Sequence, residues 1–194
     1  KTALIAGSGA LPAALAEAMP EKPLVTALEG HAPEGLVVDL SFRVERLVPF
    51  LRALQREGVE EVIFAGAVTR PRLDPALLDP DTASLLPRLM QAMAAGDDAT
   101  LRVVIALFEE AGFRVEGVEA VAPALLPGPG VLAGKVNAQD EADAARAAAI
   151  VAALGAVDVG QGAVVVQGLC LAVEALPGTD AVLEAVAGFK PGLR

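Results

Sequence analysis

The sequence predicts an α/β protein in two parts, a parallel sheet covered by helices followed by a smaller α/β domain. Short apolar runs alternate with longer stretches of helical periodicity, and glycines directly follow several of these runs. A segment with three prolines and three glycines, 123–134, interrupts both patterns. Because 54% of the 194 residues are hydrophobic, a core can be buried. We expect an N-terminal domain, a linker and a C-terminal domain at 1–127, 128–134 and 135–194.

Glycines mark the ends of the first predicted elements. An apolar run at 2–6 ends in Gly7-Ser8-Gly9 and is followed by an alanine-rich stretch at 10–19, which predicts a strand, a turn and a helix. The same reasoning predicts two further strands and an amphipathic helix that Gly58 ends, at 24–28, 36–40 and 44–57.

The run 61–66 is the clearest buried strand, because β-branched and aromatic residues stand together before a glycine. Asp97 is placed to cap the second of two helices that follow, with Asp98 in its first turn. These helices and a last strand are expected at 82–94, 98–111 and 113–118. Strands that alternate with helices form parallel sheets, whose ligands gather at the carboxyl ends of the strands.

The C-terminal part is predicted to be a helix, a hairpin and a second helix. Asn137 is placed to cap an alanine-rich helix, and two apolar strands flank Gln167-Gly168. Thr179 is placed to cap a last helix at 180–187. This part is small for an independent core, and 189–194 is typical of the start of further structure. We therefore expect a C-terminal α/β domain that is truncated within these 194 residues.

Composition excludes several classes of function. The formal net charge of −10 repels a nucleic acid backbone, so nucleic acid is not an expected partner. A single cysteine, Cys170, cannot form an intrachain disulfide, and its apolar surroundings predict a buried structural thiol. A single histidine, His31, excludes a multi-histidine metal site and is expected in a surface loop. No apolar stretch has the length of a membrane span, so any membrane contact is expected to be peripheral.

The loop at 7–12 has the beginning of a phosphate-binding motif. Glycines at Gly7 and Gly9 would let backbone N–H groups approach an oxyanion at a helix N-terminus, although Pro12 replaces the third glycine. Glu29 stands near the position at which an acidic residue meets a ribose, so a dinucleotide site stays open. The alternative is that these glycines only make a tight turn.

Two further groups of polar residues follow apolar strands. Arg70 and Arg72 lie in the loop after the strand at 61–66, where arginine suits bidentate contact with phosphate. In the C-terminal part, 158–162 and 174–180 flank the hairpin, where a cleft against the first domain could form. The alternatives are solvated arginines, turn glycines and a simple helix cap.

Taken together, five segments resemble, in order, the motifs of LpxI-type UDP-2,3-diacylglucosamine pyrophosphatases. The resemblance extends over the whole chain, and the order of the segments makes it more specific than any one of them. The segments are Gly7-Ser8-Gly9-Ala10-Leu11-Pro12, Gly66-Ala67-Val68-Thr69-Arg70-Pro71, Gly96-Asp97-Asp98 with Leu101-Arg102, Asp158-Val159-Gly160-Gln161 and Glu174-Ala175-Leu176-Pro177-Gly178-Thr179-Asp180.

This resemblance implies hydrolysis of UDP-2,3-diacylglucosamine to UMP and 2,3-diacylglucosamine 1-phosphate, a step of lipid A synthesis that usually depends on Mg²⁺. It implies a Rossmann-like N-terminal domain, with the lipid-bearing UDP-sugar held between the two domains. The implied location is the cytoplasm, with peripheral contact at the inner membrane, and a homodimer is left open. The residues expected to bind substrate are Gly7, Ser8, Gly9, Leu11, Arg70, Gln161, Thr179 and Asp180.

The chain also departs from the family pattern in one respect. Members of the family carry their metal-binding aspartate in a segment that would lie beyond Arg194, so no catalytic or metal-binding residue is assigned within the chain. We therefore expect these 194 residues to bind substrate and to be inactive alone. The competing hypotheses are a nucleotide-binding Rossmann-like module without catalysis and an inert interaction domain.

Overall fold

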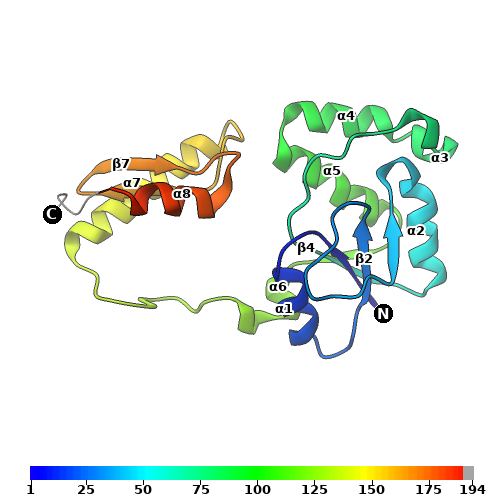
Figure 1. Ribbon diagram of the computed structural model, residues 1–194, viewed down its shortest axis with the longest axis horizontal. Helices are drawn as coiled ribbons and strands as arrows, with labels where there is room; N and C mark the ends of the chain where they lie inside the picture. Colours follow the sequence, from blue (N-terminus) through cyan, green and yellow to red (C-terminus); the bar gives the residue numbers. More distant parts are fainter. Residues whose placement is uncertain (190–194) are drawn as a thin grey trace. The chain divides into compact units, whose positions relative to one another are not determined.

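The computed structural model describes residues 1–189 and divides the chain into two compact units, Lys1–Gly128 and Pro129–Arg194 (Figure 1). Residues 126–137, around the division, form neither helix nor strand. Proline has no N–H and glycine is conformationally free, which explains why this segment continues neither pattern. The two units are called unit 1 and unit 2.

Unit 1 contains a five-stranded sheet whose neighbouring strands are all parallel. The strand order is β3-β2-β1-β4-β5, so the order reverses direction between β1 and β4. The strands are β1 (Thr2–Ala6), β2 (Leu24–Leu28), β3 (Leu40–Phe42), β4 (Glu61–Ala65) and β5 (Arg114–Glu116). The predicted α/β class with a parallel sheet is confirmed.

Helices cover both faces of this sheet, and β1 shows why. Ala3 and Ile5 belong to one apolar cluster, whereas Leu4 and Ala6 belong to another, as the alternation of side chains along a strand requires. The first cluster is completed by α2 (Leu47–Arg56), α4 (Leu86–Ala95) and α5 (Asp97–Glu110). The second is completed by α1 (Leu11–Ala18) and α6 (Val118–Val121). The short 3₁₀ segments of unit 1 are η1 (Val44–Arg46), η2 (Pro75–Leu77) and η3 (Pro123–Leu125).

The helix expected at 82–94 is instead two helices, α3 (Pro80–Ala83) and α4. Pro87 explains the break, because it has no N–H to donate to a carbonyl of the preceding turn. Thr82 is not the start of a helix but lies buried within α3. Its hydroxyl accepts the N–H of Val48 at 3.0 Å and donates to the Asp79 carboxylate at 3.1 Å.

The strand expected at 36–40 is also displaced, because β3 begins only at Leu40, opposite Thr26 of β2. Asp39 precedes it and is bound to Val25 through both its backbone and its side chain. The Asp39 N–H donates to the Val25 carbonyl at 2.8 Å, and the Val25 N–H donates to the Asp39 carboxylate at 2.9 Å. The carboxylate thus occupies a position that a strand neighbour would fill.

Unit 2 consists of α7 (Ala138–Gly155), the antiparallel hairpin β6 (Ala163–Val166) and β7 (Leu169–Val173), and α8 (Gly178–Ala187). Asn137 caps α7 as predicted, in a capping box with Asp140. The predicted turn is also confirmed, since Gln167 and Gly168 have φ of 50° and 76°, as a tight hairpin requires.

Two predictions for unit 2 were wrong. Cys170 is exposed, because β7 belongs to a sheet of two strands in which no side chain is fully buried. Thr179 does not cap α8, which begins one residue earlier at Gly178. Its hydroxyl donates instead to the Glu174 carboxylate at 2.8 Å.

Candidate functional site

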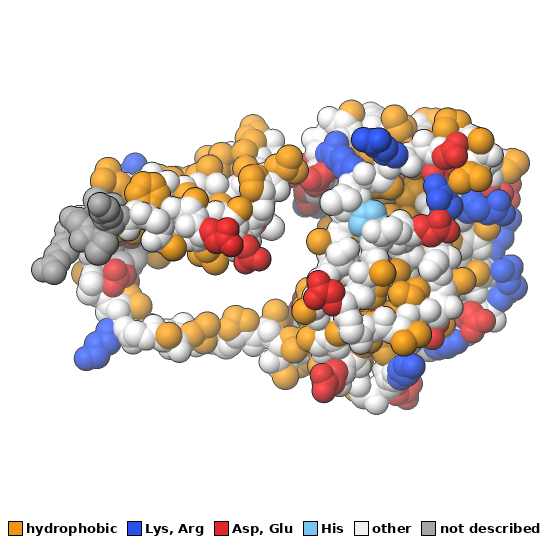
Figure 2. Space-filling model, in the orientation of Figure 1, with side chains coloured by type: hydrophobic (Ala, Val, Ile, Leu, Met, Phe, Trp, Pro, Cys, Tyr) orange, Lys and Arg blue, Asp and Glu red, His pale blue; other side chains and the backbone are white. Residues whose placement is uncertain are grey.

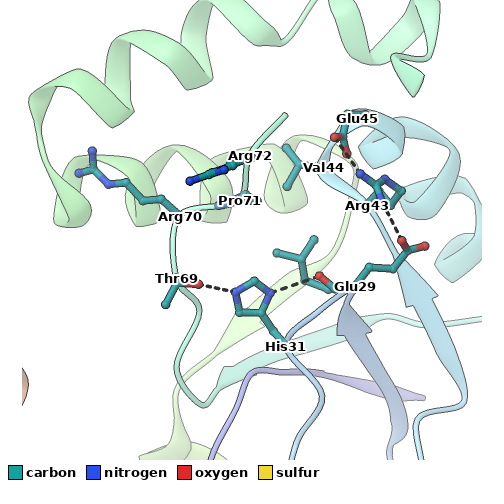
Figure 3. A pocket seen from close by; sticks show the side chains of 10 residues that line it. Glu29, His31, Arg43, Val44, Glu45, Thr69, Arg70, Pro71 and Arg72 are labelled. Carbon is teal, nitrogen blue, oxygen red and sulfur yellow. Dashed lines mark hydrogen bonds and ion pairs between the residues drawn. The ribbon is translucent and has the colours of Figure 1, made fainter. Parts of the chain in front are cut away.

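The candidate site of unit 1 is a pocket at the carboxyl edge of the sheet, where the chain leaves β2, β3 and β4 (Figure 3). It encloses about 260 Å³. In Figure 2 the single histidine reaches the surface of unit 1, with acidic and basic side chains around it. The lining residues are Leu28 and Glu29, His31, Arg43 to Glu45, and Thr69 to Arg72.

His31 joins two of the loops that form this pocket. Its Nδ1 lies 3.3 Å from the Glu29 carbonyl and its Nε2 lies 2.8 Å from the Thr69 hydroxyl. A carbonyl only accepts hydrogen bonds, so Nδ1 carries the proton and, in the neutral ring, Nε2 accepts from Thr69. The sequence indicated only a surface loop, and nothing in the spacing of these residues predicts the bridge.

Arg43 lies between two carboxylates at the wall of the pocket. Its guanidinium donates to Glu29 at 2.8 Å and to Glu45 at 3.2 Å, and hydrogen bonds to Glu45 and then Glu29 raise the pKa of Arg43. Glu45 is 3% exposed and also accepts the N–H of Asp74 at 2.7 Å. Burial favours a higher pKa for Glu45, but the hydrogen bonds from backbone N–H groups and Arg43 outweigh it and lower the pKa. The Arg43 guanidinium is therefore charged and fixed in orientation, and the two carboxylates already balance its charge.

Arg70 and Arg72 stand on one loop but differ in their partners. Arg70 donates to the Asp97 carboxylate through Nε at 2.9 Å and Nη2 at 2.6 Å, while Arg72 forms no ion pair with any residue of 1–189. The prediction that Asp97 caps a helix was wrong, because α5 begins at Asp97 and Gly96 is its N-cap. Arg72 is the arginine of this pocket whose charge is available to an anion.

The glycine loop after β1 contacts the loop after β4 directly. The Gly7 N–H donates to the Ala65 carbonyl at 2.7 Å, and Ser8 exchanges backbone hydrogen bonds with Ala67 at 2.8 and 3.0 Å. An added Cβ at Gly66 would lie 2.7 Å from the Gly7 backbone. Two N–H groups expected to face a phosphate are thus engaged within the chain. Among residues 1–189 the Gly9 N–H has no acceptor.

The remaining predicted substrate-binding residues are placed as follows. Leu11 is the first residue of α1 and 47% exposed. In unit 2, Gln161 and Asp180 are exposed, and Thr179 is bound to Glu174. The segments 158–162 and 174–180 do meet, because the Glu174 N–H donates to the Gly162 carbonyl at 2.8 Å. Their role in binding substrate stays a prediction.

The described residues do not supply an evident metal site. Within 1–189, no group of three or more His, Cys, Asp or Glu side chains is arranged to hold a metal ion. The acidic residues of the pocket, Glu29 and Glu45, are both paired with Arg43. The Mg²⁺ that the family resemblance implies therefore has no fitted set of ligands among residues 1–189.

Two family models match the chain. The LpxI N-terminal domain matches residues 1–125, and the LpxI C-terminal domain matches residues 128–193. The chain belongs to the LpxI family. A relative, the UDP-2,3-diacylglucosamine pyrophosphatase LpxI of Caulobacter vibrioides, is 39% identical over 201 aligned residues. The alignment covers 100% of this chain and 71% of that LpxI protein. The predicted family is confirmed.

Within the part of this LpxI chain that the structure describes, no helix combines the length and apolar character needed to cross a bilayer.

Proposed function

We propose that this LpxI-family chain binds UDP-2,3-diacylglucosamine for the reaction that hydrolyses its pyrophosphate to UMP and 2,3-diacylglucosamine 1-phosphate in lipid A biosynthesis. The observation that carries the proposal is the similarity over the full chain to a relative named for that activity. The pocket of unit 1 supports it, because it lies at the carboxyl edge of a parallel sheet and contains an arginine with no ion pair among residues 1–189.

In this proposal Arg72 contacts a phosphate of the substrate, and Arg70 joins it after leaving Asp97. Guanidinium groups suit the planar, bidentate recognition of phosphate oxygens. Arg43 is less suited, because two carboxylates already accept from it. The Gly9 N–H, two residues before α1, is a further donor for an anionic group.

Dependence on Mg²⁺ remains part of the proposal through the family resemblance alone. A divalent cation would neutralise the charge that develops on the phosphates during hydrolysis. A lipid-bearing substrate also supports peripheral contact with the inner membrane from the cytoplasm, and a homodimer stays a proposal. For the described residues we propose the binding of the nucleotide sugar.

A second candidate is a nucleotide-binding module without catalysis. It is favoured by Glu29, which directly follows β2, the position of the ribose-binding acid in dinucleotide sheets. NAD and NADP would be its expected ligands. The glycine loop weakens this candidate, since Gly7 and Ser8 use their N–H groups within the chain.

One experiment separates the two candidates. Calorimetric titration with UDP-2,3-diacylglucosamine, NAD and NADP is paired with an assay of UMP release in the presence of Mg²⁺. We expect the UDP-sugar to bind and the dinucleotides not to bind. Binding of NAD or NADP without binding of the UDP-sugar would overturn the proposal. Release of UMP would require an acidic residue within the chain to hold the metal, with Asp180 the first to substitute.

A further inference from the structure

Glu29 occupies a distinctive place in the pocket. It is the residue directly after β2, which neighbours the central strand β1, in a sheet of order β3-β2-β1-β4-β5. In dinucleotide-binding sheets of this order, an acidic residue at the end of the second strand meets a hydroxyl of a ribose. Figure 3 shows the Glu29 side chain at the pocket, on the side opposite the loop that bears Arg72.

The Glu29 carboxylate is held in place but not fully used. Arg43 donates to Oε2, whereas Oε1 accepts no hydrogen bond from residues 1–189, and the side chain is 51% exposed. Arg43 is in turn bound to Glu45, which is buried and tied to the Asp74 N–H. A carboxylate oriented in this way needs little reordering to accept a hydrogen bond from a ligand.

The size and charge of the pocket match one part of a nucleotide. Its volume of about 260 Å³ is below the roughly 300 Å³ at which pockets begin to enclose whole drug-sized ligands. A ribose with its phosphate is a fragment of suitable size. The hydroxyls of a ribose donate to a carboxylate, and its phosphate accepts from a guanidinium, so Glu29 and Arg72 offer the two complementary groups.

We infer that Glu29 accepts a hydrogen bond from the ribose 2′-hydroxyl of the uridine nucleotide, with Arg43 and Glu45 as positioning residues and the phosphate toward Arg72. This inference rests on the proposed function, because the uridine nucleotide is the product of that reaction. It makes Glu29 a residue that selects ribonucleotides over deoxyribonucleotides.

The test compares the affinities of UMP and 2′-deoxy-UMP by calorimetry for the wild-type chain, Glu29→Ala and Glu29→Gln. The matched control is Glu110→Ala, which removes another exposed glutamate paired with an arginine, Arg88. The wild-type chain and the control should prefer UMP by about tenfold or more, the strength of one hydrogen bond to a charged group. In Glu29→Ala the two affinities should become nearly equal, and Glu29→Gln should lie between.

Equal affinities in the wild-type chain, or a preference that survives in Glu29→Ala, would overturn the inference. A loss of affinity for both nucleotides by the same factor would also overturn it, because a purely structural role predicts that result. Absence of UMP binding would do the same. A preference for UMP in a chain that does not bind UDP-2,3-diacylglucosamine would instead overturn the proposed function and leave the role of Glu29 intact.

Discussion

Unit 1 and unit 2 differ in the kind of residue that is buried inside them. In unit 1 the buried side chains are mostly apolar and form two clusters, one on each face of the sheet. Among the described residues of unit 2, only Asp143 and Glu174 are buried, each 8% exposed, and both are acidic. Unit 1 is thus ordered by apolar layering, and unit 2 by two anchored carboxylates.

Each of these two buried carboxylates fixes a turn of unit 2. Asp143 of α7 accepts the N–H groups of Gln167 and Gly168, both at 2.7 Å, and so binds the hairpin turn to the helix. Glu174 packs against Gly160 and Gly162, where an added Cβ would collide with it, and accepts from Thr179. A small unit that lacks an apolar core can therefore define its geometry through charge-assisted hydrogen bonds.

The largest effect is expected in unit 1 at Gly66. Gly66→Val places a branched side chain on a residue with φ of 97°, and its Cβ would lie about 2.7 Å from the Gly7 backbone. The Gly7 backbone cannot easily move away from this contact. The matched control is Gly58→Val, at φ 72° with no atom within 4 Å of the added Cβ. By urea unfolding, Gly66→Val should lose about 2–3 kcal/mol more than the control. Equal losses would show that the glycine contact does not organise the sheet edge.

The next largest effect is expected at Asp143, which binds the hairpin turn of unit 2 to α7. Asp143→Asn keeps the shape of the side chain but removes its charge, so the hydrogen bonds to the hairpin turn weaken. Hydrogen exchange at the Gln167 and Gly168 amides should accelerate by about tenfold. Glu184→Gln, on the exposed surface of α8, should leave both amides unchanged. Unchanged exchange in Asp143→Asn would remove the distinction between the two units.

Acidic pH should weaken the same hydrogen bonds of Asp143. Burial favours a higher pKa for Asp143, but hydrogen bonds from Gly168, Gln139 and Gln167 outweigh it and lower the pKa. The resulting stabilisation is complete above the unfolded pKa of about 3.9 and is lost as the pH falls through the lower folded pKa. On acidification below about pH 4, the melting temperature of the wild-type chain should therefore fall more than that of Asp143→Asn. Parallel pH profiles would contradict this.

A smaller effect is expected at the pocket loop of unit 1. Asp97→Asn removes the charge that holds Arg70, so Arg70 becomes available to a phosphate. Affinity for UDP-2,3-diacylglucosamine should rise by about two- to fivefold, and unfolding free energy should change by less than about 0.5 kcal/mol, because the ion pair is exposed. Titration and urea unfolding measure the two quantities. A fall in affinity would mean that Asp97 orients Arg70 for binding.

Much of the fold could be predicted because local signals and tertiary packing agree. The strand at 61–66 has a run of β-branched and aromatic residues, and Asn137 stands at the start of an alanine-rich helix. Predictions were wrong where a single proline or the small size of a sheet determined the local structure. Pro87 divides a helix, and the two-stranded sheet leaves Cys170 exposed.

The candidate site could be predicted only in part. Its place at the carboxyl edge of the sheet follows from the alternation of strands and helices. The pairing of Arg70 with Asp97 joins residues 27 positions apart, and the bridge from His31 to Thr69 joins residues 38 apart. Such contacts depend on how the loops pack, so sequence spacing could not show that Arg72, unlike Arg43 and Arg70 of the same pocket, forms no ion pair with residues 1–189.

The claim that the pocket of unit 1 binds the phosphate portion of a UDP-sugar can be tested by measuring the affinity of Arg72→Ala for UDP-2,3-diacylglucosamine. Arg56→Ala is the matched control, since Arg56 is also exposed and forms no ion pair with residues 1–189. We predict that Arg72→Ala weakens binding by about tenfold or more, while the control stays within about twofold of the wild-type chain. Binding by Arg72→Ala as tight as that of the wild-type chain, or no binding by the wild-type chain, would contradict the claim.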